Sequence, residues 1–205
     1  MEPSLEIKGV PVWKSCLDAD AQTRLVDEVR AVCRAAPLFR PVTPRGQEMS
    51  VRMTSAGRLG WVTDRRGYRY EPRHPSGADW PPVPATAMEV WRAVSGVDRA
   101  PDSCLVNFYG EGARMGLHQD RDEGDFDWPV VSISLGDAAL FRVGGTERRD
   151  PTSSVWLESG DVCRLSGPAR LAFHGIDRVR HGSSSLLPDG GRINLTMRIV
   201  VRRPG

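Results

Sequence analysis

The half of the chain that begins at Cys104 is a succession of short alternating segments separated by glycine, and this pattern constrains the fold most strongly. In VSISL (131–135) apolar residues alternate with serines, so the two kinds of side chain fall on opposite faces of a strand. Similar patterns predict further strands at 140–143, 155–157, 161–165 and 169–174. Short strands with turn residues between them are typical of a β-sandwich or barrel.

The preceding half predicts two helices and an extended start at 5–13. In residues 18–36, Leu25, Val29 and Val32 recur at helical spacing, and Pro37 ends the pattern. Residues 85–94 repeat the pattern after three prolines. A length of 205 residues suits one compact unit. The expected fold class is therefore α+β, mainly β, with N-terminal helices.

The last predicted strand, RINLTMR, carries charged residues on the face that would point into the interior of a sandwich. Arg192, Asn194 and Arg198 share one face, and the other face is apolar. Inward arginines are costly unless they meet anions, and two long guanidinium arms can converge on a short dicarboxylate. Asn107 and Tyr109 also share a face and offer an amide and a phenol to the same pocket.

A candidate metal site lies at His118-Gln119-Asp120. On an extended segment His118 and Asp120 point the same way and can hold two neighbouring positions on one metal ion. A second histidine on another strand would complete two His and one carboxylate, which leaves three positions open. His174, placed at the end of the predicted strand 169–174, is the candidate, whereas His74 and His181 are taken as structural. The alternative is a solvated loop pair.

Residues 40–84 mix arginines with aromatic residues and glycine turns. Arginines beside aromatic faces suit a phosphate backbone and an extruded base. The alternative is an ordinary hairpin with a solvated basic face, and a net charge of +2 gives no strong field toward nucleic acid. The residues concerned are Arg45, Arg52, Arg58, Arg65, Arg66, Arg69 and Arg73, with Trp61, Tyr68 and Tyr70.

Five segments together resemble one family: MSVRMTSAGRLGWVTDRRGYRYEP, NFYGEGARMGLHQDRDE, PVVSISLG, FHGI and RINLTMR. They look like the AlkB family of Fe(II)- and 2-oxoglutarate-dependent dioxygenases, in particular its bacterial DNA-repair members, and span roughly residues 45–200. The resemblance implies a double-stranded β-helix (jelly roll) with a nucleotide-recognition lid. We therefore expect residues 1–100 to form an N-terminal extension and lid, and 101–205 the dioxygenase core.

The resemblance also implies roles for individual residues. It places Fe(II) on His118, Asp120 and His174, and 2-oxoglutarate against Asn107, Tyr109, Arg192, Asn194 and Arg198, with Arg198 also counted as catalytic. Trp61 and Tyr68 would lie along the substrate, with Asp122 beside the methylated base and Arg148 near the nucleic acid. The implied reaction uses O2 to demethylate N1-methyladenine and N3-methylcytosine in DNA, and yields formaldehyde, succinate and CO2.

One departure from the family pattern is Leu165, where close relatives carry a tryptophan, so the shape of the pocket could differ there. Two other functions stay open. One is a 2-oxoglutarate oxygenase that acts on RNA, a peptide or a small molecule, and the other is a non-enzymatic jelly-roll binding module. The sequence ranks neither DNA against RNA nor single against double strands, although single-stranded DNA is the expected substrate.

The four cysteines form no CxxC pair and predict reduced thiols. MEPSLEIKGV lacks the apolar run of a signal peptide, and no later stretch is long enough to span a membrane. The expected protein is a cytoplasmic monomer with no membrane partner.

Overall fold

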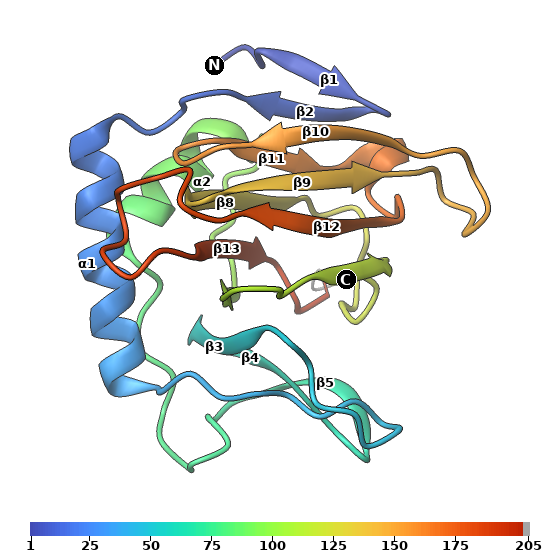
Figure 1. Ribbon diagram of the computed structural model, residues 1–205. Helices are drawn as coiled ribbons and strands as arrows, with labels where there is room; N and C mark the ends of the chain where they lie inside the picture. Colours follow the sequence, from blue (N-terminus) through green and yellow to red (C-terminus); the bar gives the residue numbers. More distant parts are fainter. Residues whose placement is uncertain (203–205) are drawn as a thin grey trace.

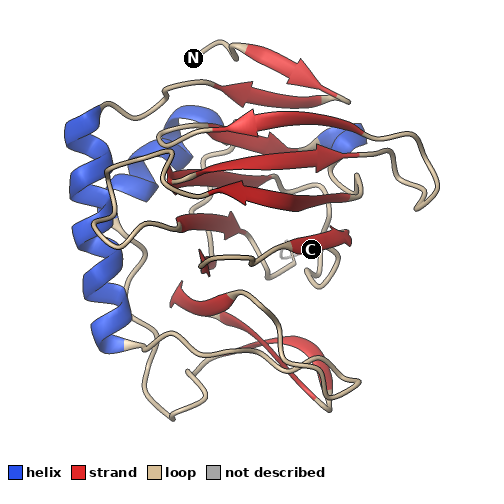
Figure 2. Ribbon diagram, in the orientation of Figure 1, coloured by secondary structure: helices blue, strands red, loops and turns tan. Residues whose placement is uncertain are grey.

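The computed structural model describes residues 1–202, in which two β-sheets pack face to face and two helices lie outside the larger sheet (Figures 1 and 2). The larger sheet has seven strands in the order β1-β2-β11-β8-β13-β6-β3, and the smaller has four in the order β10-β9-β12-β7. The seven are β1 (Leu5–Ile7), β2 (Val10–Trp13), β3 (Arg52–Gly57), β6 (Ser103–Tyr109), β8 (Val130–Gly136), β11 (Val162–Leu165) and β13 (Arg192–Arg198). The four are β7 (Met115–His118), β9 (Ala138–Val143), β10 (Ser153–Leu157) and β12 (His174–Arg180).

Both predicted helices are present. Helix α1 (Ala19–Ala35) begins where the Asp18 carboxylate accepts a hydrogen bond from the backbone N–H of Ala21, and α2 (Ala85–Val94) follows Pro84. Their apolar faces pack on one side of the seven-stranded sheet, where Trp91, Leu25 and Ile133 belong to the same core cluster. The four-stranded sheet covers the other side, so the alternating strands predicted from the sequence form a jelly-roll sandwich with a second core between the sheets.

The prediction of a strand at 169–174 is wrong. Residues Gly167–Ala169 form a short 3₁₀ helix (η1), turns follow, and His174 opens β12 instead of ending a strand. The backbone N–H of Ala169 bonds the carbonyl of Ser166, and that of Ala172 bonds the carbonyl of Ala169, so the backbone is coiled and not extended. Leu171 and Phe173 therefore alternate with their neighbours along a turn and not along a strand.

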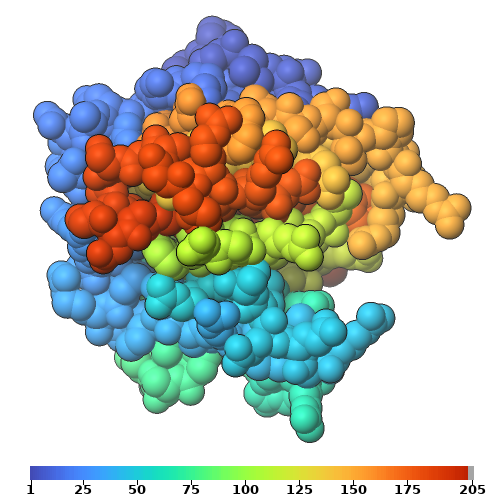
Figure 3. Space-filling view, in the orientation of Figure 1, coloured from blue at the N-terminus to red at the C-terminus, as the bar shows by residue number. Residues whose placement is uncertain are grey.

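Residues 40–84 divide between the core and a separate hairpin. Strand β3 joins the seven-stranded sheet beside β6, whereas β4 (Gly60–Asp64) and β5 (Gly67–Glu71) pair only with each other. We call residues 60–71 the lid hairpin. It stands off the sandwich at one end of the molecule, and a notch separates it from the core strands in the space-filling view (Figure 3). A Cβ at Gly60 would lie 2.2 Å from the Trp80 ring, so only glycine allows the hairpin to start there.

The chain shows no candidate for a membrane-crossing helix within residues 1–202, because neither helix is long and apolar enough.

Candidate active site

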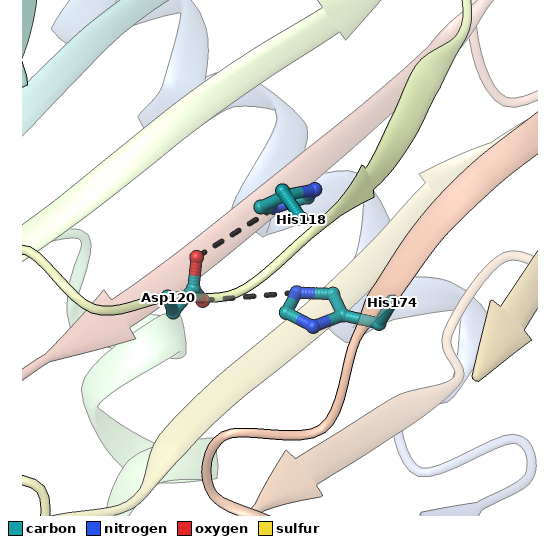
Figure 4. A group of neighbouring side chains, drawn as sticks. All are labelled: His118, Asp120 and His174. Atoms are coloured by element: carbon teal, nitrogen blue, oxygen red, sulfur yellow. Dashed lines mark ion pairs between the residues drawn. The ribbon is translucent and has the colours of Figure 1, made fainter. Parts of the chain in front are cut away.

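Two histidines and an aspartate meet where β7 ends beside the start of β12 (Figure 4). His118 is the last residue of β7 and His174 the first of β12, and the two are direct cross-strand partners. Their side chains therefore share a face, with ring centroids 4.5 Å apart. Asp120 follows β7 by two residues, and one ligand atom from each residue lies within 4.8 Å of the other two. The sequence thus placed the three residues in one cluster even though the strand before His174 was wrong.

Backbone hydrogen bonds orient both rings. Nδ1 of His118 lies 2.9 Å from the carbonyl of Gly116, and Nδ1 of His174 lies 2.9 Å from the carbonyl of Ala172. A carbonyl only accepts, so each Nδ1 carries the proton and each Nε2 keeps its lone pair. The Nε2 atoms lie 3.7 and 3.8 Å from the two oxygens of Asp120. Three electron-pair donors with no proton between them are a suitable setting for a divalent cation.

Charge and burial shift the pKa values of His174 and Asp120. Burial and the neighbouring His118 lower the pKa of His174 to about 4, so that ring is neutral at pH 7. Burial opposes ionisation of Asp120, but the charge and hydrogen bond of Arg198, together with the neighbouring His174 and His118, outweigh it and hold the pKa of this carboxyl below its usual range. The site therefore presents a neutral imidazole at His174 and a carboxylate at Asp120.

The triad lines a cavity of about 640 Å³ that the inward face of β13 also enters. Arg198 is buried, and its Nη2 lies 2.8 Å from Asp120 Oδ2. Arg192 is only 1% exposed, and its Nη2 donates to Ser134 Oγ at 3.0 Å. Among the described residues no carboxylate pairs with Arg192, and its Nε and Nη1 have no hydrogen-bond acceptor. A buried cation with free donors fits an anionic ligand at this end of the cavity.

The two asparagines lie on adjacent strands as direct partners, Asn107 on β6 and Asn194 on β13. Asn194 Nδ2 donates to Ser132 Oγ and the Ile133 carbonyl, and its Oδ1 accepts from Asn107 and Thr196. The Asn194 amide is thus satisfied within the protein and fixes the position of Asn107.

Tyr109 is buried opposite Arg192, whose guanidinium lies 5.1 Å from the centre of the tyrosine ring. Both side chains line the cavity. Burial raises the pKa of this phenol, so Tyr109 stays a neutral hydrogen-bond donor.

Residues predicted to meet the substrate lie at the mouth of the same cavity. Trp61 stacks on Tyr68 with ring centroids 5.6 Å apart, and its indole N–H donates to Asp122 Oδ2 at 2.8 Å. Arg148 lies 5.7 Å from the centre of the Phe173 ring and also lines the cavity. Leu165 is buried in the cavity wall.

Sequence reasoning missed a buried group behind Asp120. Glu123 pairs with Arg170 at 3.0 Å and with Nε of Arg198 at 3.3 Å, and accepts a hydrogen bond of 2.5 Å from the phenol of Tyr70. Arg170 also donates to the backbone carbonyl of Asp120 at 2.7 Å. The acidic run after Asp120 was the one available signal, but it did not indicate partners so distant in the sequence.

Comparison with known proteins identifies this architecture. Residues 9–198 match the family described as the 2OG-Fe(II) oxygenase superfamily. The chain is 56% identical over 198 residues to the alpha-ketoglutarate-dependent dioxygenase AlkB homolog of Caulobacter vibrioides, covering 96% of this chain and 90% of that one. The chain belongs to the AlkB family of Fe(II)- and 2-oxoglutarate-dependent dioxygenases.

Two further members support the assignment across the whole fold. Identity to the alpha-ketoglutarate-dependent dioxygenase AlkB of Escherichia coli is 41% over 184 residues, which is 87% of this chain and 85% of that one. The solved structure of OsALKBH1 superposes with a TM-score of 0.78 at 30% identity, covering 95% of this chain and 97% of the other. As a family member the protein uses Fe(II), 2-oxoglutarate and O2. The His118, Asp120 and His174 cluster and the unpaired donors of Arg192 fit the metal and the dicarboxylate.

Proposed function

We propose that this dioxygenase removes N-methyl groups from N1-methyladenine and N3-methylcytosine in DNA, and so repairs alkylation damage by direct reversal. Relatives point to this class of substrate: one from Arabidopsis thaliana, 32% identical over 220 residues and twice as long, is named a DNA N(6)-methyladenine demethylase. The observation that carries the proposal is Asp122, a carboxylate at the cavity mouth beside the stacked Trp61 and Tyr68.

The chemistry of the lesions explains a carboxylate in this position. N1-methyladenine and N3-methylcytosine are cationic, so their burial in a cavity costs desolvation energy that a nearby anion offsets. An unmodified base is neutral and gains less from Asp122. Methylated bases also pair badly, so extruding them from a duplex costs less than extruding normal bases.

In this proposal His118, Asp120 and His174 hold the iron, and Arg192 binds the distal carboxylate of 2-oxoglutarate. Asn107 and Tyr109 donate hydrogen bonds beside it, Asn194 keeps Asn107 in place, and Arg198 neutralises Asp120 next to the metal. When bound, the iron supplies oxidative decarboxylation of 2-oxoglutarate to succinate and CO2, coupled to hydroxylation of the N-methyl group. The resulting hydroxymethyl group leaves as formaldehyde: its hydroxyl proton passes to solvent, and the electron pair of the broken C–N bond stays on the ring nitrogen, which makes the base neutral.

Recognition of the nucleic acid belongs to the lid hairpin in this proposal. Trp61 and Tyr68 offer aromatic faces to the extruded nucleotide, and Arg148 and the lid arginines hold phosphates. Single strands are the favoured substrate because no partner base has to be displaced. Stacking of one base on an aromatic side chain is worth about 1–3 kcal/mol.

We also propose that the enzyme acts as a cytoplasmic monomer. All four cysteines are free thiols, which suits a reducing compartment. Few large apolar side chains are exposed within residues 1–202, which suits a protein without an obligate partner. They are Met1, Leu5, Tyr68, Phe126 and Val201.

The decisive experiment measures formaldehyde release from oligonucleotides of one sequence made as DNA or RNA, single- or double-stranded, with or without one N1-methyladenine. The proposal expects release that depends on the lesion and is fastest on single-stranded DNA. Faster release from RNA would reassign the substrate to RNA. Conversion of 2-oxoglutarate to succinate that no oligonucleotide stimulates would refute a nucleic-acid substrate.

A further inference from the structure

The lid hairpin contacts the active-site loop through two consecutive acidic residues. Trp61 on β4 and Tyr70 on β5 are direct cross-strand partners, so their side chains lie on one face of the hairpin. The indole of Trp61 donates to Asp122, and the phenol of Tyr70 donates to Glu123. The hairpin forms no strand pairing with either sheet of the sandwich, so these two bonds are specific ties between it and the loop.

The acceptors of these two hydrogen bonds differ in their burial and in their other partners. Asp122 is exposed at the cavity mouth, whereas Glu123 is 7% exposed and is held on both sides by buried arginines. Arg170 approaches from η1 and its turn at 3.0 Å, and Arg198 approaches from β13 with Nε at 3.3 Å. Burial raises the pKa of Tyr70 well above its usual value, so the phenol stays protonated and keeps donating.

A continuous set of contacts therefore runs from the lid to the metal cluster. Tyr70 touches Glu123, Glu123 touches Arg198, and Arg198 touches Asp120 through the pair at 2.8 Å. Arg170 braces the same loop by donating to the backbone carbonyls of Asp120 and Trp128. These contacts connect Glu123, the acceptor of the lid's Tyr70, to Arg198 and to the Asp120 loop.

We propose that Tyr70 and Glu123 are positioning residues that couple the lid hairpin to the iron and 2-oxoglutarate centre. Neither touches the reacting atoms. Glu123 holds Arg198 against Asp120 on one side and the Tyr70 phenol on the other, so filling the centre orders the lid. By linkage an ordered lid raises the affinity of the centre for 2-oxoglutarate by the same factor. This inference rests on the proposed iron and 2-oxoglutarate site.

Hydrogen exchange on the full chain tests the coupling without turnover. Amide exchange of residues 60–71 is measured by mass spectrometry for the metal-free protein and for protein with Mn(II) and 2-oxoglutarate, under argon. We expect the two ligands to slow exchange in the native lid hairpin. Tyr70→Phe, which removes a single oxygen, should lose most of that protection. The loss should be roughly 10- to 100-fold, the range that a hydrogen bond to a charged group carries.

A second variant and a matched control separate coupling from simple loosening. Glu123→Gln keeps an acceptor for Tyr70 but weakens the pairing with Arg198, so the ligand-dependent protection should fall here too. It should fall no further when both changes are combined. Thr63→Val removes a hydrogen bond that ties the same hairpin to the Val42 carbonyl, away from the site. It should speed exchange equally with and without ligands and leave their ratio unchanged.

The proposal would be overturned if Tyr70→Phe kept the native ratio of exchange rates with and without ligands. It would also be overturned if exchange in the native lid hairpin did not change on addition of Mn(II) and 2-oxoglutarate. Loss of the ratio in Thr63→Val as well would show general loosening and also reject the specific tie. Formaldehyde release on the same preparations is scored separately. A coupled lid in a protein that demethylates no oligonucleotide would leave the tie standing and refute the proposed substrate.

Discussion

Replacing Arg192 with methionine should stabilise the protein without ligands and abolish its response to 2-oxoglutarate. Arg192 is 1% exposed, donates to Ser134 Oγ and lies beside the Tyr109 phenol, and no carboxylate pairs with it among the described residues. Burial lowers the pKa of this guanidinium, which indicates that the fold bears a cost for keeping it charged. Methionine matches the aliphatic part of the arginine side chain and is apolar, so it removes that cost, and the space of the missing guanidinium adds to the existing cavity.

Two magnitudes follow. Replacing buried charge by a packed apolar side chain gains about 1–4 kcal/mol. For a chain of this length that gain raises the melting temperature by roughly 2–4 °C per kcal/mol. The loss of a buried charge-assisted pair with the distal carboxylate of 2-oxoglutarate costs about 3–5 kcal/mol, which raises the dissociation constant by roughly 10²- to 10⁴-fold.

The assay is thermal unfolding followed by circular dichroism, first on the metal-free protein and then with Mn(II) and a titration of 2-oxoglutarate. Arg192→Met should melt higher than the native chain without ligand and show no further rise with 2-oxoglutarate. Arg24→Met, on the exposed face of α1, is the control and should change neither value. A ligand-free Arg192→Met protein that melts well below the native chain, or one that keeps the native response to 2-oxoglutarate, would refute the reasoning.

Four further outcomes are expected. Trp61→Ala should weaken binding of a methylated oligonucleotide roughly 10- to 100-fold and preserve uncoupled conversion of 2-oxoglutarate to succinate; parallel loss of both would make Trp61 a packing residue. Gly175→Ala should weaken Mn(II) binding, measured by calorimetry, because a Cβ there would lie 2.6 Å from the Met115 carbonyl and push β12 off β7; unchanged affinity would contradict this. Between pH 6.5 and 4 the metal-free protein should lose stability as pH falls, because unfolded His174 binds its proton near 6.5 and folded His174 near 4. In urea titrations at pH 7, 6 and 5, a His174→Gln chain should lose less stability than the native chain. Equal losses would reject the role of His174. Iodoacetamide should modify Cys16 and Cys33 in the native protein before Cys104 and Cys163, whose thiols are buried with pKa values raised by burial to about 12; early labelling of Cys163 would show that the sandwich opens.

The sequence predicted features that depend on strand periodicity. Arg192, Asn194 and Arg198 fall on the inward face of β13 because alternation is a local property of extended backbone, and their partners on β6 are in register with them. Helices α1 and α2 were predictable for the same reason, since their apolar residues recur at helical spacing. His118 and Asp120 could be paired because only one residue separates them in the sequence.

Features that depend on tertiary contacts were not predictable. Residues 169–174 alternate in hydropathy as a strand does, and a turn braced by the inward Arg170 gives the same short pattern. Glu123 looked like one more loop acid, because its partners Tyr70 and Arg170 lie 53 and 47 residues away in the chain. The unpaired state of Arg192 likewise becomes visible only when every neighbouring strand is in place.

The position of β13 has a consequence for how the chain is made. This strand, late in the sequence, lies between β6 and β8 near the middle of the seven-stranded sheet, and Asn194 pairs with Asn107 across 87 residues. While a ribosome is still adding residues before Arg192, β6 and β8 have no neighbour between them and expose open edges that invite aggregation. The seven-stranded sheet cannot be completed until β13 has been made, and a nascent fragment that stops short of β13 is a candidate substrate for chaperones and proteases.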